Sequence, residues 1–206
     1  MTIPAEEHLK PWQPLTLDSL DVLFRGIAVP VWIAGGYALE LAAGTPWRAH
    51  ADIDVLVLRP HWPSVQRHLA DWDIWAADPP GRLRPLAKAE TLPPHVHDLW
   101  LRRTPADPWQ LQVMIDEVSP GEPSTWASRR DPRLTRPLAA LGTARFGALR
   151  VLAPEIQLFY KARGLRDKDR QDFDVMLPLL SAAQRHWLRR AIETAHGSDH
   201  PWLSRL

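Results

Sequence analysis

Apolar and polar residues follow two different patterns on either side of a glycine pair near the start of the chain. Apolar residues run from Val29 to Ala34 and stop at Gly35-Gly36, after which they recur at helical spacing through Ala42. This pattern predicts a strand, a tight turn and a helix. Polar and apolar residues then alternate over residues 52–58, which predicts a second strand with one polar face at its start.

The rest of the chain predicts further strands and then helices. Before residue 153, the further patterns are a helix over residues 17–27 capped by Thr16 or Asp18, a helix over 59–70, a strand over 72–77, a hairpin of 96–103 and 109–118, and a short helix over 124–131. After residue 153, helices open at Pro154, Lys168 and Ser181. Residues 78–94 are rich in proline and predict a surface loop. We therefore expect an α/β (α+β) fold with a mixed sheet over residues 1–152 and a helical C-terminal part over 153–206 packed on it.

Composition narrows the class of protein. The 206 residues are 45% hydrophobic, which is enough for a sizeable core, and the net charge of +1 argues against a nucleic-acid binder that relies on a strong basic field. Cysteine is absent, which excludes disulfides and thiolate metal sites. Neither a signal peptide nor an apolar run of membrane-spanning length is seen, so we expect a cytoplasmic protein with no membrane partner. No feature indicates the oligomeric state.

The glycine pair and the polar strand face together suggest chemistry. Asp52 and Asp54 point to one side of the predicted strand, and paired carboxylates form a hard oxygen site suited to Mg²⁺. Gly35 and Gly36 leave backbone N–H groups open at a helix start, where phosphate binds well. Each motif alone is common, since a glycine pair often marks only a turn and two aspartates often mark a solvated edge. Their combination favours a site for Mg²⁺ and phosphate.

At these residues the sequence resembles the nucleotidyltransferase superfamily of the polymerase β type. The match consists of Gly35-Gly36, Arg48, His50, Asp52 and Asp54. The sequence is similar in particular to the aminoglycoside and lincosamide nucleotidyltransferase-like group, which shares the opening Gly35-Gly36-Tyr37-Ala38. Residues 152–163 and 168–173 also resemble the helical part of that group, so the resemblance covers most of the chain.

The resemblance implies a function. The implied reaction transfers a nucleoside monophosphate from ATP or another NTP to a hydroxyl of a small molecule. An aminoglycoside-type molecule is one candidate acceptor. In this interpretation Asp52 and Asp54 hold Mg²⁺ and Gly35 and Gly36 cradle the β and γ phosphates. Arg48, His50 and Lys161 then neutralise negative charge. A second interpretation of Lys161 is a snorkelling side chain on an apolar helix.

The resemblance also implies a third carboxylate, which acts as the base or completes the metal site. It belongs on the strand predicted over residues 109–118. The register that fits best puts Gln112 at that position, with Asp116 further along the same face. A glutamine cannot take up a proton at neutral pH, so Gln112 and Asp116 are both candidates for the third group. Two other functions therefore stay open: a catalytically weak nucleotide-binding regulatory module, and a toxin-type transferase that acts on tRNA or protein.

Overall fold

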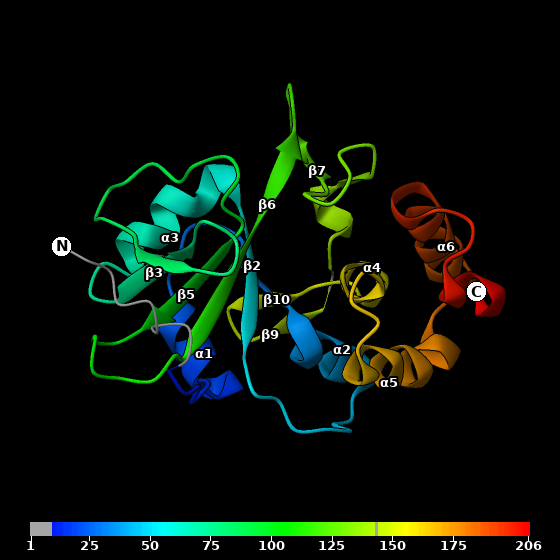
Figure 1. Ribbon diagram of the computed structural model, residues 1–206, viewed down its shortest axis with the longest axis horizontal. Coiled ribbons are helices and arrows are strands. Elements are labelled where there is room, and N and C mark those ends of the chain that lie inside the picture. The colour runs from blue at the N-terminus through cyan, green and yellow to red at the C-terminus, as the bar shows by residue number, and fades with distance from the viewer. Residues whose placement is uncertain (1–9, 143) are drawn as a thin grey trace. The chain divides into compact units, whose positions relative to one another are not determined.

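The computed structural model describes residues 10–142 and 144–206, and these form two compact units. The first unit takes the chain up to Ile33, then Ala49–Asp116 and Arg145–Arg150, and the second takes Ala34–Arg48, Glu117–Ala144 and Val151–Leu206. Each unit is thus built from several segments, whereas the predicted division separates only the residues after 152 from the rest. Together the elements make the mixed α+β fold that the sequence predicts (Figure 1).

A mixed sheet forms the centre of the first unit. Its strands are β1 (Trp32–Ile33), β2 (Asp54–Leu58), β3 (Asp73–Ala77), β4 (Leu83–Pro85), β5 (Asp98–Arg102), β6 (Leu111–Ser119), β9 (Arg145–Phe146) and β10 (Leu149–Val151). They lie in the order β4-β3-β5-β6-β2-β1-β10-β9. β2 and β6 pair in parallel, while β5–β6 and β1–β2 are antiparallel, so the sheet is mixed as predicted. The expected hairpin of β5 and β6 is confirmed.

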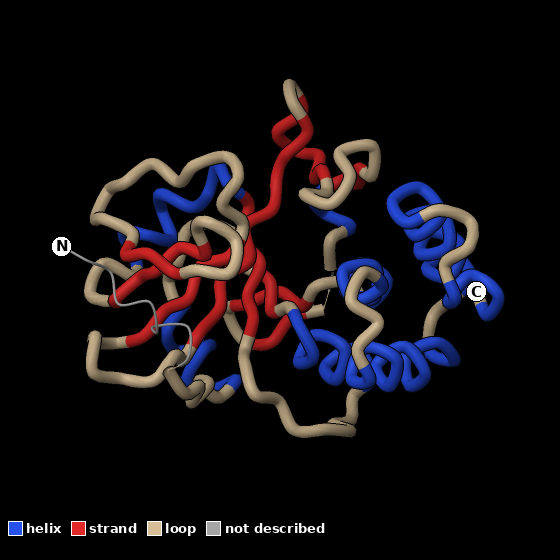
Figure 2. The backbone as a smooth tube through the Cα atoms, in the orientation of Figure 1, coloured by secondary structure: helices blue, strands red, loops and turns tan. Residues whose placement is uncertain are grey.

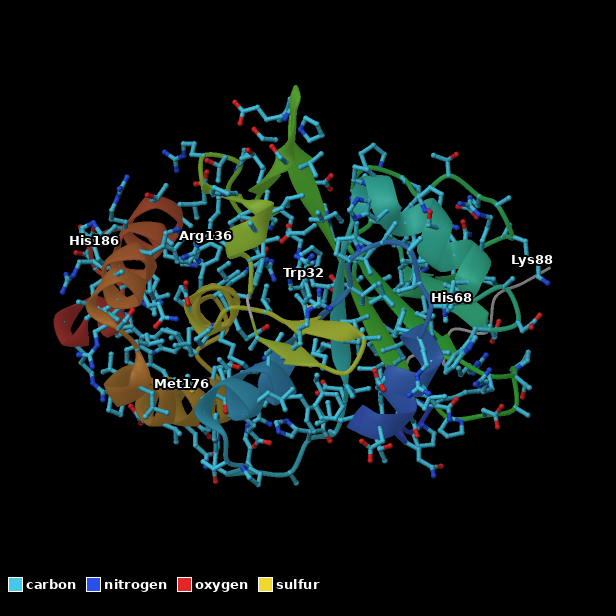
Figure 3. All side chains as sticks on the ribbon, turned by 180° about the vertical axis from the view of Figure 1, so that it is seen from behind. Trp32, His68, Lys88, Arg136, Met176 and His186 are labelled. Carbon is cyan, nitrogen blue, oxygen red and sulfur yellow. The ribbon has the colours of Figure 1, made fainter. Side chains whose placement is uncertain are left out.

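Two short α-helices accompany this sheet, α1 (Leu17–Phe24) and α3 (Trp62–His68). Thr16 caps α1, because its hydroxyl oxygen accepts a hydrogen bond of 3.1 Å from the Ser19 N–H, as predicted. The imidazole of His68, labelled in Figure 3, lies 2.6 Å from the Leu23 carbonyl oxygen and ties α3 to α1. The helix predicted over residues 59–70 begins as the 3-10 turn η2 (Arg59–His61) before it becomes α3.

Tryptophans pack between the outer strands of the first unit. Trp109 is fully buried and meets Trp75 and Trp100 edge to face, with ring centroids 6.1 and 5.7 Å apart. The guanidinium of Arg102 lies 4.4 Å from the ring centre of Trp109 and donates to Asp73 over 2.7 Å. This cluster joins β3 and β5 to Trp109, which lies two residues before β6. The register of β5 against β6 matters for the site described below.

The second unit is mainly helical, as the blue segments of Figure 2 show. Its elements are α2 (Gly35–Ala43), β7 (Glu122–Ala127), β8 (Thr135–Pro137), η3 (Leu138–Ala140), α4 (Pro154–Ala162), α5 (Asp167–Met176), η4 (Leu177–Leu179), α6 (Ala182–His196) and η5 (Pro201–Arg205). α4 is buried along its length and contacts α2, α5 and α6. The predicted capping box of α6 is present, with Ser181 and Gln184 each accepting from the other's backbone N–H. Throughout the described ranges, every helix is too short or too polar to cross a membrane.

Two local predictions were wrong. The short helix expected over residues 124–131 is instead the strand β7, in which Trp126 is fully buried and pairs with Val118 of β6. Sheet pairing and burial of Trp126 override the helical spacing of this segment. The proline-rich segment 78–94 contains the short strand β4, which pairs with β3.

Candidate functional site

The two predicted aspartates lie where β2 begins, with Asp54 as its first residue and Asp52 two residues before it. Asp52 and Asp54 are half-buried, whereas Ile53 between them is fully buried. This alternation is what a strand with one polar face requires, because successive side chains point to opposite sides. The two carboxylates therefore leave the same face of the first unit's sheet.

The register of β2 against β6 decides which group faces these aspartates. Asp54 pairs with Gln112, as the sequence predicts, and Leu58 pairs with Asp116. Four residues of extended strand separate the two pairs, which corresponds to about 13 Å along the sheet. Asp116 is also fully buried. The register therefore does not bring Asp116 beside Asp54, and it places Gln112 opposite Asp54.

Asp98 at the start of β5 is a polar neighbour that the sequence interpretation missed. Its Oδ1 atom accepts a hydrogen bond of 3.2 Å from Nε2 of Gln112, and Asp98 is half-buried. Because β5 pairs with β6 through Trp100 and Gln112, Asp98 lies on the same face as Gln112. The sequence predicts the hairpin of β5 and β6. Its pairing register would have shown that Asp98 lies near Gln112.

The hydrogen bond from Asp98 orients the amide of Gln112. With Nε2 held by Asp98, the other end of the amide is the carbonyl oxygen Oε1, which is an acceptor. The polar groups near the start of β2 therefore include two carboxylates and one amide, and the nitrogen of that amide is hydrogen-bonded to a third carboxylate. Across the described residues no group of three His, Asp or Glu side chains is arranged to hold a metal ion. Mg²⁺ is commonly bound through one or two carboxylates together with substrate phosphates, and Asp52 and Asp54 fit that pattern.

The glycine turn belongs to the second unit. Gly35 has a φ of 65°, which suits glycine, and begins α2 directly after β1. Its N–H donates a buried hydrogen bond of 2.8 Å to Oε1 of Gln157 on α4. Of the two N–H groups predicted to bind phosphate, that of Gly35 is therefore already hydrogen-bonded to Gln157. Ala34, the N-cap residue of α2, provides no side-chain cap for the helix.

Arg48 holds the segment that follows α2. Its guanidinium makes a two-pronged ion pair with Asp172 of α5, with both contacts at 2.8 Å. The indole N–H of Trp47 donates to the same carboxylate over 2.9 Å. Glu40 on α2 accepts from the backbone N–H groups of Trp47 and Arg48 at 3.0 and 3.2 Å. The segment is thus tied to both α2 and α5.

Lys161 completes this cluster from α4. Its ammonium lies 2.9 Å from Asp172 and 3.4 Å from Asp169, and both carboxylates are fully buried. Burial raises the pKa of the Asp172 carboxyl, but the hydrogen bond from Arg48 and the charge of Lys161 outweigh burial and lower that pKa to about 2. Lys161 is therefore an ion-paired lysine rather than a snorkelling one.

These contacts bear on the predicted phosphate-binding groups. Arg48 and Lys161 each have carboxylate partners within the second unit, which gives both a structural role. His50 is half-buried in the segment that leads to Asp52. A role of these three residues toward phosphate stays a prediction.

Known proteins share this sequence pattern and fold. The family model described as Aminoglycoside-2''-adenylyltransferase matches residues 17–176. The solution structure of the antibiotic-resistance factor ANT(2'')-Ia is similar with a TM-score of 0.55 and 16% identity, over 87% of this chain and 94% of that one. The crystal structure of ANT(2'')-Ia with adenylyl-2''-tobramycin gives 0.56 and 17%, over 86% and 97%.

A third solved structure has a similar fold. The lincomycin-bound lincosamide antibiotic adenylyltransferase LnuA is similar with a TM-score of 0.53 and 17% identity, over 79% of this chain and 96% of that one. At these identities the likeness shows the fold. No curated protein sequence gives a match. The family model covers well over half of the chain, and the chain therefore belongs to the aminoglycoside-2''-adenylyltransferase family.

Proposed function

We propose that the protein is a Mg²⁺-dependent nucleotidyltransferase that moves a nucleoside monophosphate, with ATP as the preferred donor, to a hydroxyl of a small molecule. The observation that carries this proposal is the pair of half-buried carboxylates at the start of β2, on one sheet face with the oriented amide of Gln112. Membership of the family supports the reaction class. One solved relative is bound to adenylyl-2''-tobramycin and another to lincomycin, which supports an antibiotic-like acceptor with free hydroxyls.

Each residue of the first unit has a distinct part in this proposal. Asp52 and Asp54 hold Mg²⁺, which when bound neutralises phosphate charge and stabilises the leaving pyrophosphate. Gln112 offers a neutral oxygen that makes one weak contact to Mg²⁺ but cannot remove the proton of the acceptor hydroxyl. Positioning and charge neutralisation therefore provide most of the rate enhancement, because this strand position holds no base.

The groups of the second unit serve the nucleotide in this proposal. Gly36 offers its backbone N–H to phosphate, while the N–H of Gly35 is engaged by Gln157 and keeps the turn in shape. Arg48 and Lys161 contribute positive charge, although both also hold Asp172. His50 follows Arg48 by two residues and contributes a further polar group.

Labelled nucleotide tests the proposal directly. The protein is incubated with Mg²⁺, ATP labelled at the α phosphate, and tobramycin, lincomycin or other small polyols. We expect label in the acceptor together with pyrophosphate release, and loss of both with chelator or in Asp54→Asn. Asp52→Asn and Asp54→Asn should keep or gain thermal stability, since each removes one of two neighbouring like charges. Transfer that persists in Asp54→Asn would contradict the assigned role of this carboxylate.

The amide at position 112 favours a second candidate function, a nucleotide-binding regulatory module with weak or no transfer. Both candidates predict that Mg²⁺ and ATP together stabilise the fold, by about 2.7 kcal/mol at a nucleotide concentration near 100 times the Kd. Only the enzyme releases pyrophosphate in the presence of an acceptor. Stabilisation without pyrophosphate release, across the acceptors and the four common NTPs, would favour the regulatory module.

A further inference from the structure

The first unit contains a pocket away from the start of β2. Its volume is about 540 Å³, within the range of small-molecule sites, and it lies between α3 and the segment of residues 86–92. The wall is mainly apolar, and its large apolar side chains are Trp62, Leu69, Trp72, Ile74, Leu86 and Leu92. An apolar ligand of moderate size can therefore be desolvated there.

Hydrogen bonds hold the wall formed by residues 86–92 in place. Nε2 of Gln66 on α3 donates to the Ala87 carbonyl oxygen over 3.2 Å. The guanidinium of Arg59 donates to the carbonyl oxygens of Pro93 and Pro94 at 3.1 and 3.0 Å. Glu90 accepts from the Ala87 N–H at 3.0 Å. The pocket is thus formed without a ligand, which lowers the entropic cost of binding.

The polar groups around the pocket carry mainly positive charge. Arg67 and Lys88 line it and are exposed, and Lys88 lies at the periphery of its unit in Figure 3. The hydrogen bond found for Arg67 goes to the neutral hydroxyl of Ser64, at 3.2 Å. Glu90 is the carboxylate that lines the pocket, and Arg84 pairs with it at 2.8 Å. The charges of Arg67 and Lys88 therefore remain available to an anion.

Trp62 adds a buried donor to this wall. Its side chain is 2% exposed, and its indole N–H has no hydrogen-bond partner among the described residues. The Nε1 atom is itself shielded from solvent, so the ring of Trp62 contributes apolar surface to the pocket.

We propose that this pocket binds a small amphipathic carboxylate, with an aliphatic or aromatic body against Trp62 and Trp72 and its anionic head near Arg67 and Lys88. The apolar wall provides affinity, and the two cations discriminate against neutral molecules of the same shape. This ligand site is separate from the residues proposed for nucleotidyl transfer. It does not depend on that proposal.

Binding of decanoate and decanol to the full chain, measured by titration calorimetry, tests this inference. The two probes share a chain length and differ in head group. We expect saturable binding of decanoate and about tenfold weaker binding of decanol. Arg67→Glu combined with Lys88→Glu should weaken decanoate binding by about tenfold or more without changing the melting temperature, since both residues are exposed.

Two further variants complete the test. Arg145→Glu reverses an exposed charge of the same unit that does not line the pocket and should bind decanoate normally. Ala70→Trp adds bulk at an exposed position in the pocket wall and should abolish binding. The inference is overturned if decanoate does not bind, if decanol binds as tightly, or if the charge-reversed or Ala70→Trp variant binds decanoate as well as the parent.

Discussion

Gln112 is the residue on which the rate of the proposed transfer depends most. It pairs with Asp54 across the parallel strands β2 and β6, where a carboxylate would serve as base or metal ligand. The amide has nearly the same shape as glutamate but carries no charge and takes up no proton near neutral pH. Transfer by this protein is therefore expected to be slow for its family.

Gln112→Asp should raise nucleotidyl transfer. The substitution places a carboxylate opposite Asp54, and a positioned base typically contributes about 10² or more to the rate. Pyrophosphate release with Mg²⁺, ATP and an acceptor measures the effect, and Gln112→Asn is the matched neutral control. Asp116→Asn should leave turnover nearly unchanged, because Asp116 pairs with Leu58 instead. If Asp116→Asn lowers the turnover by a larger factor than Gln112→Asp raises it, Asp116 rather than position 112 provides the third group of the site.

Asp98 is a positioning residue in this scheme, since it acts through the amide of Gln112. Asp98→Ala should free that amide to rotate and weaken Mg²⁺ binding in the presence of ATP by about 10-fold or more, as loss of groups behind metal ligands commonly does. Thermal shift across a Mg²⁺ titration gives the affinity. Asp98→Asn keeps an acceptor oxygen for Gln112 and should bind Mg²⁺ nearly as well as the parent. Equal affinities in all three proteins would show that Asp98 does not orient the site.

At the scale of elements, the ion pair of Arg48 and Asp172 links the segment after α2 to α5. Asp172 is fully buried, so removal of its main partner leaves a poorly compensated charge. Arg48→Ala should therefore lower the free energy of unfolding by about 3 kcal/mol in urea titrations. Lys161 and Trp47 remain as partners and keep the loss from being larger.

The matched control for Arg48→Ala is Arg25→Ala. Arg25 pairs at 3.0 Å with Asp21, which lies one helical turn earlier in the sequence. The side chain of Arg25 is 68% exposed. Exposed pairs of this kind contribute about 1 kcal/mol or less. A loss as small in Arg48→Ala as in Arg25→Ala would mean that the buried pair is not needed to hold the segment.

At the scale of the whole molecule, buried carboxylates make the free energy of unfolding decrease as the pH falls into the acid range. The pKa of Asp172 is lowered from 3.8 to about 2 in the folded protein, because Arg48 and Lys161 outweigh the effect of burial. A lowered pKa stabilises the folded state above the unfolded-state value and loses that contribution as pH falls through the folded-state value. The pKa of Asp169 shifts in the same direction through Arg166 and Lys161, against the opposing effect of burial.

The free energy of unfolding should fall by about 2 kcal/mol through Asp172 alone between pH 4 and pH 2. Asp172→Asn removes this titration, so its stability should decline less steeply over the same range than that of the parent. Urea titrations at several pH values give both curves. Parallel curves for the two proteins would contradict a lowered pKa at Asp172.

Hydrophobic periodicity and local motifs in the sequence determined most of the elements and the position of the carboxylate pair. The capping box of α6, the Thr16 cap and the turn at Gly35 were predictable because each depends on a few adjacent residues and their backbone geometry. The alternation around Ile53 likewise placed Asp52 and Asp54 on one face.

Contacts between residues far apart in the sequence were decided only by the tertiary structure. β7 became a strand because its pairing with β6 buries Trp126, which outweighs local helical spacing. Asp98 reached Gln112, and Arg48 reached Asp172, through strand register and helix packing. Side-chain partners at such separations depend on the arrangement of whole elements, so no local pattern of residues specifies them.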